Sequence, residues 1–159
     1  MPNQLSSVGL DFGILLGLAY QQFVDALNAH LREGGFTDLK PSFGYVIRAV
    51  DHEPLTATRL ASRLHMTPQG AAKLIDELVD RGYIQRLPEQ TDKRVRRLAL
   101  AVRGEQLLTE ARAFHQAFEQ RFAQRHGLRR AAALRSALEA LVAEDDAAIR
   151  TARRLLRPL

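Results

Sequence analysis

The chain contains no cysteine among its 159 residues. Disulfide bonds, thiolate-based redox sensing, cysteine-ligated zinc and iron–sulfur clusters are therefore excluded. The five histidines are scattered without the spacing of a metal site, so we expect no metal and no other cofactor. A nucleophile motif, a paired-carboxylate signature and a glycine-rich phosphate loop are missing too. These absences argue against an enzyme.

Long apolar runs are also missing. The apolar segment from Phe12 to Ala19 is too short to span a bilayer, and no basic segment precedes it as in a signal peptide. We therefore expect a cytoplasmic protein without a membrane partner. Low-complexity segments and internal repeats are not seen, and with 46% apolar residues the chain can bury a real core as one domain.

Positive charge is concentrated in one segment. The formal net charge of the whole chain is +5. Residues 81–97 alone carry six basic and two acidic side chains, which leaves a local charge of +4. A local basic patch indicates a polyanionic partner more strongly than a high isoelectric point does.

Apolar residues recur with helical spacing at both ends of the chain. We expect one amphipathic helix over about 10–31, ended by Gly34-Gly35, and a second that begins near Pro41, because proline suits the first helical position. From Val102 the chain returns to helix, with one break before a last helix that reaches about residue 156. The expected buried stripe of the first helix is Phe12, Leu16, Ala19, Phe23, Ala26 and His30.

Two short helices are predicted between these long ones. Thr56 fits the N-cap of a helix that runs to about His65. Thr67 caps the next helix, Pro68 occupies its first position, and Gly82 closes it. The expected inward face of that helix is Ala71, Leu74, Ile75, Leu78 and Val79. Two short helices joined by a tight turn form a helix-turn-helix, whose second member can lie in a DNA major groove.

A basic β-hairpin is predicted directly after the second short helix. Residues 83–87 and 95–100 look like two strands, and the segment 88–92 between them is rich in turn-forming residues. A helix start can bind anions, and a flexible basic hairpin beside it can reach a second groove of the same duplex. This arrangement describes a winged helix, so the sequence favours a protein that binds double-stranded DNA.

The predicted DNA site combines the first half of the second short helix with the hairpin. Gln69 can pair with a base edge, most naturally adenine, and the Ala72 methyl group can touch a thymine methyl group. Lys73 and the free amide groups of the first turn suit phosphates. Arg94 is the best candidate for insertion into a minor groove, and Asp92 is expected to orient it rather than to contact phosphate. The full predicted set is Thr67, Pro68, Gln69, Gly70, Ala72, Lys73, Arg86, Asp92, Lys93, Arg94 and Arg96.

Acidic residues limit how this helix can approach DNA. Asp76, Glu77 and Asp80 lie in its second half, where they would repel a phosphate backbone. The helix can therefore approach DNA only by its N-terminal end. The competing interpretation is a winged helix that binds an acidic protein partner through the basic hairpin. Acidic residues confined to the far end of the helix favour DNA over that partner.

A set of ring side chains outside the DNA site could line a pocket for a ligand. The candidates are Tyr20, Phe23, Phe43 and Tyr45, with His30 placed to meet a ligand carboxylate. Core packing explains the same residues equally well.

The winged-helix segment resembles a known family. Two successive segments are similar to the helix-turn-helix of the MarR (multiple antibiotic resistance regulator) family. They are Leu55-Thr56-Ala57-Thr58-Arg59-Leu60-Ala61 and Met66-Thr67-Pro68-Gln69-Gly70-Ala71-Ala72-Lys73-Leu74-Ile75-Asp76-Glu77-Leu78. Asp92-Lys93-Arg94, followed by Leu98-Ala99-Leu100, matches that family's wing pattern of Asp-x-Arg and then Leu-x-Leu-Thr. The chain departs from this pattern at Ala101, where the usual threonine would cap the next helix at a gain of about 1 kcal/mol.

The resemblance implies a homodimeric bacterial transcription factor on a pseudo-palindromic operator. By family habit it is a repressor that a small aromatic or phenolic ligand releases. The residues agree with a dimer, because the first and last helices carry more apolar surface than a small winged core can cover, although packing within one chain is the alternative. We therefore expect a mostly α fold with a small β-hairpin wing. Residues 1–38 would form an N-terminal dimerisation helix, 39–101 the DNA-binding lobe, and 102–159 the C-terminal dimerisation helices.

Overall fold

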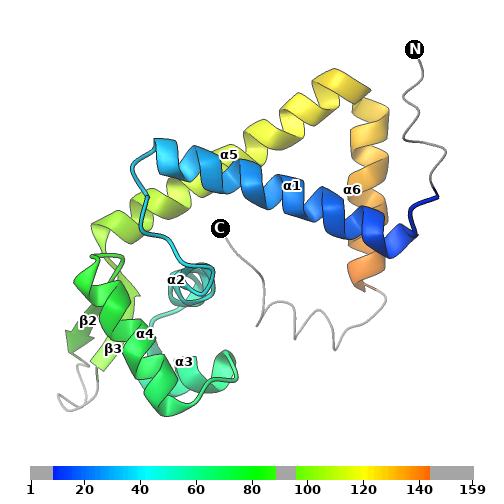
Figure 1. Cartoon of the computed structure of the whole chain (residues 1–159). Helices are drawn as coiled ribbons and strands as arrows, with labels where there is room; N and C mark the ends of the chain where they lie inside the picture. Colours follow the sequence, from blue (N-terminus) through cyan, green and yellow to red (C-terminus); the bar gives the residue numbers. More distant parts are fainter. Residues whose placement is uncertain (1–8, 89–95, 144–159) are drawn as a thin grey trace.

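Figure 1 shows the computed structural model, which describes residues 9–88 and 96–143. The fold is mostly helical with a small antiparallel sheet, which confirms the predicted fold class. In chain order the elements are α1 (Phe12–Glu33), α2 (Phe43–His52), β1 (Leu55–Thr56), α3 (Ala57–Arg63), α4 (Pro68–Asp80), β2 (Ile84–Pro88), β3 (Arg96–Leu100), α5 (Val102–His126) and α6 (Leu128–Ala143).

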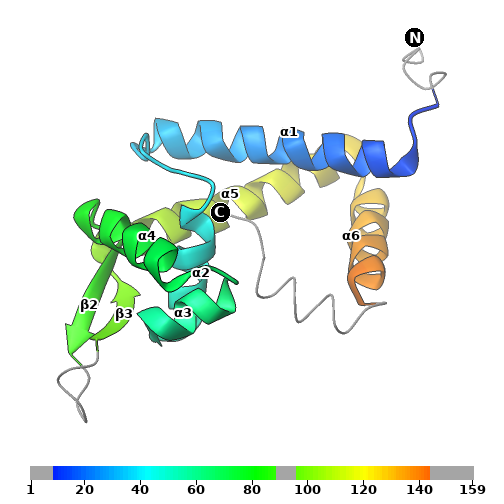
Figure 2. The ribbon, with the colours of Figure 1, turned by 60° about the horizontal axis from the view of Figure 1, so that its bottom comes forward.

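Helices α2, α3 and α4 and the three strands form a lobe at one end of the molecule, called the winged lobe below. Helix α1 packs on α5, and α6 turns back from the far end of α5 (Figures 1 and 2). Both long helices therefore connect the winged lobe to the opposite end of the protomer.

The sheet contains one strand more than the predicted hairpin. Its order is β1-β3-β2, with both pairings antiparallel. In the register, Leu98 of β3 pairs with Leu55 on one side and with Arg86 on the other. The sequence did not indicate β1, because a strand of two residues is too short to display an alternating pattern.

The core lies inside the winged lobe and under the C-terminal half of α1. In that helix Leu27 and Leu31 are buried, while Phe23 and Ala26 pack at the edge of the core. The expected stripe is wrong in its first half, where Phe12 is 71% exposed. Helical spacing identifies the helix, but only its C-terminal half has other parts of the protomer to pack against.

The start of α2 also differs from the expectation. The helix begins at Phe43, with Ser42 as its N-cap, so Pro41 does not occupy the first helical position. The Phe43 amide donates to the Lys40 carbonyl oxygen at 3.0 Å. Pro41 is therefore the second residue of a β-turn, where its fixed φ fits equally well.

The caps of the two short helices are confirmed. The Thr56 hydroxyl accepts from the Arg59 amide at 3.3 Å, and the Thr67 hydroxyl accepts from the Gly70 amide at 3.1 Å. Gly82 adopts a φ of 74° just past α4, a left-handed conformation that favours glycine. The local signals in the sequence therefore fix where α3 starts and where α4 starts and ends.

The described ranges, 9–88 and 96–143, contain neither a membrane-spanning helix nor a cluster of metal-binding side chains. None of the helices there combines the length and apolar content needed to cross a membrane. No group of three or more histidine or carboxylate side chains within those ranges could hold a metal ion.

Candidate nucleic-acid interface

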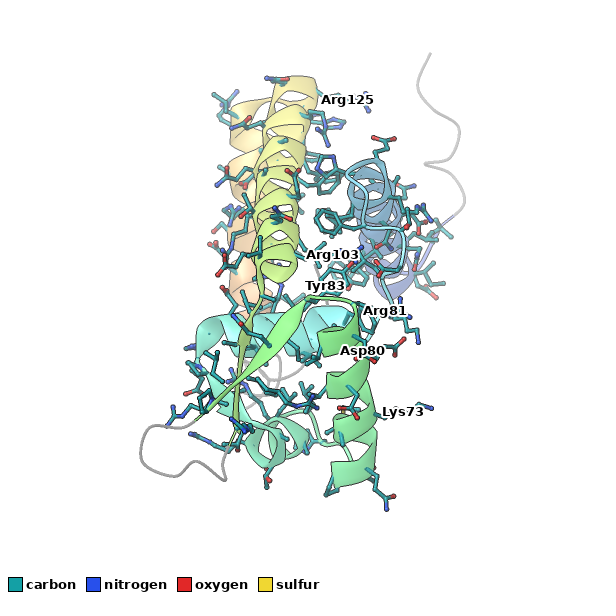
Figure 3. All side chains as sticks on the ribbon, turned by 90° about the vertical axis from the view of Figure 1, so that its left-hand side faces the viewer. Lys73, Asp80, Arg81, Tyr83, Arg103 and Arg125 are labelled. Atoms are coloured by element: carbon teal, nitrogen blue, oxygen red, sulfur yellow. The ribbon has the colours of Figure 1, made fainter. Side chains whose placement is uncertain are left out.

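The first half of α4 presents polar side chains to solvent. Gln69, Ala72 and Lys73 are exposed there, and Lys73 points away from the winged lobe (Figure 3). The opposite face of the helix is buried and consists of Ala71, Leu74, Ile75 and Leu78. Burial of that face against the lobe fixes which side of α4 a partner can reach.

The amide groups in the first turn of α4 are largely used within the chain. Pro68 has no N–H, the Gly70 amide donates to the Thr67 hydroxyl, and the Ala71 amide donates to the Thr67 carbonyl oxygen at 2.9 Å. The expected supply of free amides for phosphate is therefore wrong for Gly70, and the Ala71 amide makes the first hydrogen bond within the helix. Lys73 is left as the main cationic group of this half of the helix.

The stem of the hairpin lies on the same side of the lobe as the start of α4. Arg86 on β2 and Arg96 on β3 are exposed. The open end of the β2–β3 stem and the first turn of α4 both lie on the side of the lobe away from α1 (Figures 1 and 3). The expected tip residues Asp92, Lys93 and Arg94 lie outside the described residues.

One of the predicted phosphate contacts is engaged inside the protomer. Arg86 forms an ion pair with Asp76 of α4, and both side chains are exposed. The pair neutralises Asp76, one of the acidic residues that were expected to repel a phosphate backbone. It also holds the stem of the hairpin beside the second half of α4.

Arg81 does not contribute to this surface, although it adds to the basic count of its segment. Its guanidinium donates to the Asp38 carbonyl oxygen at 2.7 Å, pairs with Glu77 and lies 5.3 Å from the Phe43 ring centroid. A hydrogen bond from Lys40 and the Arg81 guanidinium lower the pKa of Glu77. The acidic second half of α4 is thus partly neutralised from within.

Asp38, Arg81, Tyr83 and Arg103 meet where α4 ends and α5 begins, and we call this group the Asp38 junction. Figure 3 labels Arg81, Tyr83 and Arg103 there. The Tyr83 hydroxyl donates to the Asp38 carboxylate at 2.6 Å, and the Arg103 guanidinium donates to the same carboxylate at 2.9 Å. No pattern in the sequence predicts this group, because its members lie far apart in the chain and follow no period.

The junction shifts the titration of its members. Burial raises the pKa of Asp38, but the Tyr83 hydroxyl, a backbone hydrogen bond and the two guanidinium groups outweigh burial, so the pKa lies below its ordinary value. Burial and the hydrogen bond to Asp38 raise the pKa of Tyr83. The carboxylate is therefore ionised and the phenol is protonated at neutral pH, which is the pairing that the hydrogen bond needs.

The winged lobe is similar in sequence to a known protein family. Residues 37–95 match the model of the MarR family. Over that segment the chain is similar to the MarR family. This match confirms the resemblance read from the sequence of the helix-turn-helix and the wing.

A curated relative of this chain is the "Exopolysaccharide II synthesis transcriptional activator ExpG" of Rhizobium meliloti (strain 1021). It is 32% identical over 89 residues, which is 56% of this chain and 46% of the relative. The chain thus matches about half the length of that protein.

Solved structures share the fold over most of this chain. RV1404 from Mycobacterium tuberculosis matches with a TM-score of 0.73 and 20% identity, over 88% of this chain and 98% of that chain. The F27L mutant of MepR from S. aureus, bound to an oligodeoxyribonucleotide, matches with a TM-score of 0.60 and 16% identity, over 85% and 98% of the two chains. At these identities the likeness establishes the fold alone.

The expected ligand residues are not gathered around one cavity in the described part of the chain. Phe43 is fully buried in the core, with its ring centroid 5.9 Å from that of Tyr83. The His30 Nε2 atom lies 3.4 Å from a carboxylate oxygen of Glu110. Tyr20 is exposed on α1, and Tyr45 is partly buried on α2.

Phe23 is the member of that set that lines a cavity of about 830 Å³ between α1, α5 and α6. Aromatic and aliphatic side chains make much of its wall, among them Phe118 and Phe122 of α5 and Leu134 and Leu138 of α6. The Phe23 and Phe118 rings meet edge to face, with centroids 4.9 Å apart. Polar and charged side chains, Glu119 and Arg135 among them, complete the wall, and the cavity lies outside the winged lobe.

Proposed function

We propose that this chain is a transcriptional regulator that binds double-stranded DNA as a homodimer on a pseudo-palindromic operator. The observation that carries the proposal is a shared surface. The first half of α4, with Gln69 and Lys73 exposed, lies on the same side of the lobe as the basic hairpin stem with Arg96. An exposed helix start beside a basic hairpin suits one major groove and the groove next to it.

The part of the DNA that each residue is proposed to contact follows from its side-chain chemistry. Gln69 reads a base edge, and Lys73 and Arg96 bind phosphates. Arg94 is proposed to enter a minor groove from the hairpin tip. Arg94→Ala is therefore expected to weaken operator binding strongly while leaving the dimer intact, and equal affinity in the variant would remove Arg94 from the site.

Exposed apolar residues support the proposed homodimer. They occur in the first half of α1 and along α6, and in the protomer they face solvent: Phe12, Ile14, Leu15, Leu18, Leu134, Leu138, Leu141 and Val142. Contiguous apolar surface of this kind indicates an interface between molecules. We propose that residues 1–38 and 102–159 supply the dimer contacts and that 39–101 bind DNA.

Light scattering tests this assembly. The parent is expected to have the mass of two chains, and Leu138→Glu is expected to shift it toward one. Arg129→Glu places the same charge on an exposed position of the same helix and should leave the mass unchanged. A parent with the mass of one chain contradicts the dimer.

The regulatory outcome is a finer proposal. We propose repression by occlusion of a promoter, with a small aromatic or phenolic effector altering the spacing of the two lobes. The ExpG relative is named an activator. A reporter gene placed behind the operator therefore measures whether this chain represses or activates transcription. Reporter output that rises on deletion of the regulator supports repression, and output that falls contradicts it.

Fluorescence anisotropy tests DNA binding itself, with a labelled 30-base-pair duplex pool of random sequence (about three helical turns). Lys73→Ala is expected to weaken binding and to reduce the slope of log affinity against log salt by about 1. Arg129→Ala removes an exposed cation from α6 and serves as the matched control. Failure to bind any duplex at low salt contradicts the proposal and favours the acidic protein partner instead.

A further inference from the structure

We infer that Asp38 is a positioning residue for DNA recognition: through Arg103 and Tyr83 it fixes the orientation of α4 relative to α5. This inference rests on the function proposed above, and it concerns how the reading helix is held rather than which bases it reads. The side-chain contacts of Asp38 are at the C-terminal end of α4 and not at its exposed first half, so its effect on DNA is indirect.

The carboxylate of Asp38 joins the end of α4 to the start of α5. Tyr83, just past α4, donates to it at 2.6 Å, and Arg103, in the first turn of α5, donates to it at 2.9 Å. Arg81, the C-cap residue of α4, has a guanidinium nitrogen 3.6 Å from the other carboxylate oxygen. One carboxylate thus contacts three side chains that belong to the two helix ends.

Arg103 reinforces the same joint without Asp38. It donates to the Arg81 carbonyl oxygen at 3.1 Å, and its guanidinium carbon lies 4.6 Å from the Tyr83 ring centroid. A cation at the C-terminal end of a helix is favoured by the helix dipole. The Ala101 amide also donates to the Tyr83 carbonyl oxygen at 3.0 Å, so backbone and side chains hold the two helix ends together.

The charge balance makes this joint sensitive to Asp38. The side chains of Asp38, Arg81 and Arg103 are 27%, 30% and 37% exposed, so salt screens them less than fully exposed pairs. Without the Asp38 carboxylate, Arg103 would lose this ion pair and Arg81 would keep only its pair with Glu77, so the positive charge at the α4–α5 joint would be less compensated. Repulsion between the two guanidinium groups would act to change the angle between the helices.

A small change of this angle has a large effect at the DNA end of α4. The helix has 13 residues and a length of about 20 Å, so a rotation of about 10° at its C-terminal end moves its first turn by about 3 Å. That distance is about one base-pair step along a duplex, roughly 3.4 Å. In a dimer, the junction would therefore set the spacing between the two half-sites that the protein can bind.

The first experiment measures the orientation without DNA. The chain has no cysteine, so Lys73→Cys and Gln120→Cys accept one spin label each, on exposed positions of α4 and α5. Labelled chains diluted into an excess of unlabelled chains report the distance within one protomer. Asp38→Asn is expected to broaden this distance or to shift it by up to about 2 Å, because Lys73 lies about 12 Å from the C-cap residue of α4. Asp25→Asn is the matched control, because Asp25 of α1 also accepts a side-chain hydrogen bond, from Gln21.

The second experiment measures spacing on DNA. Duplexes that the parent enriches from a random pool are cut to one half-site or kept with two. Asp38→Asn is expected to lose about tenfold in affinity on two half-sites and less than about twofold on one. Changing the spacer by one base pair is expected to restore part of the loss on two half-sites.

Each outcome separates this inference from the proposed function. An unchanged label distance together with unchanged spacing preference overturns the positioning role. An equal loss of affinity on one and on two half-sites also overturns the positioning role. Such a result indicates a folding defect or a direct contact of Asp38 with DNA. Tyr83→Phe, which removes only the donor hydroxyl, replaces Asp38→Asn in both tests if that variant does not fold. If the parent enriches no duplex, the proposed function fails, and the label distance alone still decides whether Asp38 fixes the helix angle.

Discussion

Gly104 of α5 lies against the carbonyl oxygen of Tyr83, so closely that a Cβ atom at residue 104 would be 2.1 Å from that oxygen. The neighbour is backbone, which cannot move aside as a flexible side chain can. Glycine is therefore required at this position for α5 to start where it does. The contact belongs to the same joint that Asp38 and Arg103 hold.

Gly104→Ala is expected to destabilise the protein by at least about 1–3 kcal/mol, because either α5 or the end of α4 must move. Urea unfolding at one fixed protein concentration measures the loss. Gly17→Ala in α1 is the control: among the described residues no atom lies within 4 Å of its added Cβ, so a gain of about 0.5–1 kcal/mol is expected. Equal effects of the two substitutions would contradict the close approach at Tyr83.

Ala101→Ser is expected to stabilise the protein by about 1 kcal/mol. Ala101 occupies the N-cap position of α5 with a φ of −96° and a ψ of 169°, which is the conformation of an N-cap, but alanine has no side-chain oxygen to accept from the first-turn amides. Thermal unfolding measures the gain. Ala101→Val adds bulk without an acceptor and should give no gain, so a gain from valine would show that capping is not the cause.

His115→Gln is expected to flatten the dependence of stability on pH below about 6.5, the ordinary pKa of histidine. Burial and the neighbouring Arg48 lower the pKa of His115 in the fold. Within the described residues, neither His115 Nε2 nor Arg48 Nε has a hydrogen-bond partner. Between the lowered pKa and 6.5 the unfolded chain binds more protons than the folded one, so stability falls as the pH falls.

The measurement is a series of urea unfolding curves between pH 5 and pH 8, the range in which an ordinary histidine titrates (about 6.5). The difference in unfolding free energy between parent and variant is expected to be constant above this pKa and to change below it. Asp25→Asn, whose carboxylate lies in an exposed pair with Gln21, is expected to leave the profile in this range unchanged. A pH-independent difference for His115→Gln would contradict the lowered pKa.

Gln69→Ala is expected to relax sequence preference more than it lowers non-specific affinity, because an amide on a base edge carries discrimination of about 1–3 kcal/mol. Competition between an enriched duplex and a random duplex measures the ratio. Gln124→Ala, at an exposed position of α5, is the control. An unchanged ratio in the Gln69 variant would remove it from the base contacts.

Local signals in the sequence were sufficient for the helix-turn-helix. Thr56 and Thr67 cap the helices that they were expected to cap, because an N-cap depends on residues within three positions. The same locality explains why Gly82 ends α4 as expected. The family resemblance rests on these short motifs, and the match over residues 37–95 confirms it.

Contacts between distant residues could not be read in the same way. The Asp38–Tyr83 bond joins residues 45 positions apart, and β1 acquires its strand conformation only by pairing with β3. Periodicity predicted α1 but not that its burial is confined to its C-terminal half, which depends on where α5 and the lobe lie. A count of basic residues likewise misses that Arg81 and Arg86 are paired inside the protomer.

The central claim is that two copies of this chain read a duplex through the starts of their α4 helices. Enrichment of duplexes from a random pool by the full chain tests it most directly. We predict an inverted repeat whose half-site centres lie about one helical turn, roughly 10 base pairs, apart. A pool with no enriched sequence, or with half-sites repeated in the same direction, would contradict the account.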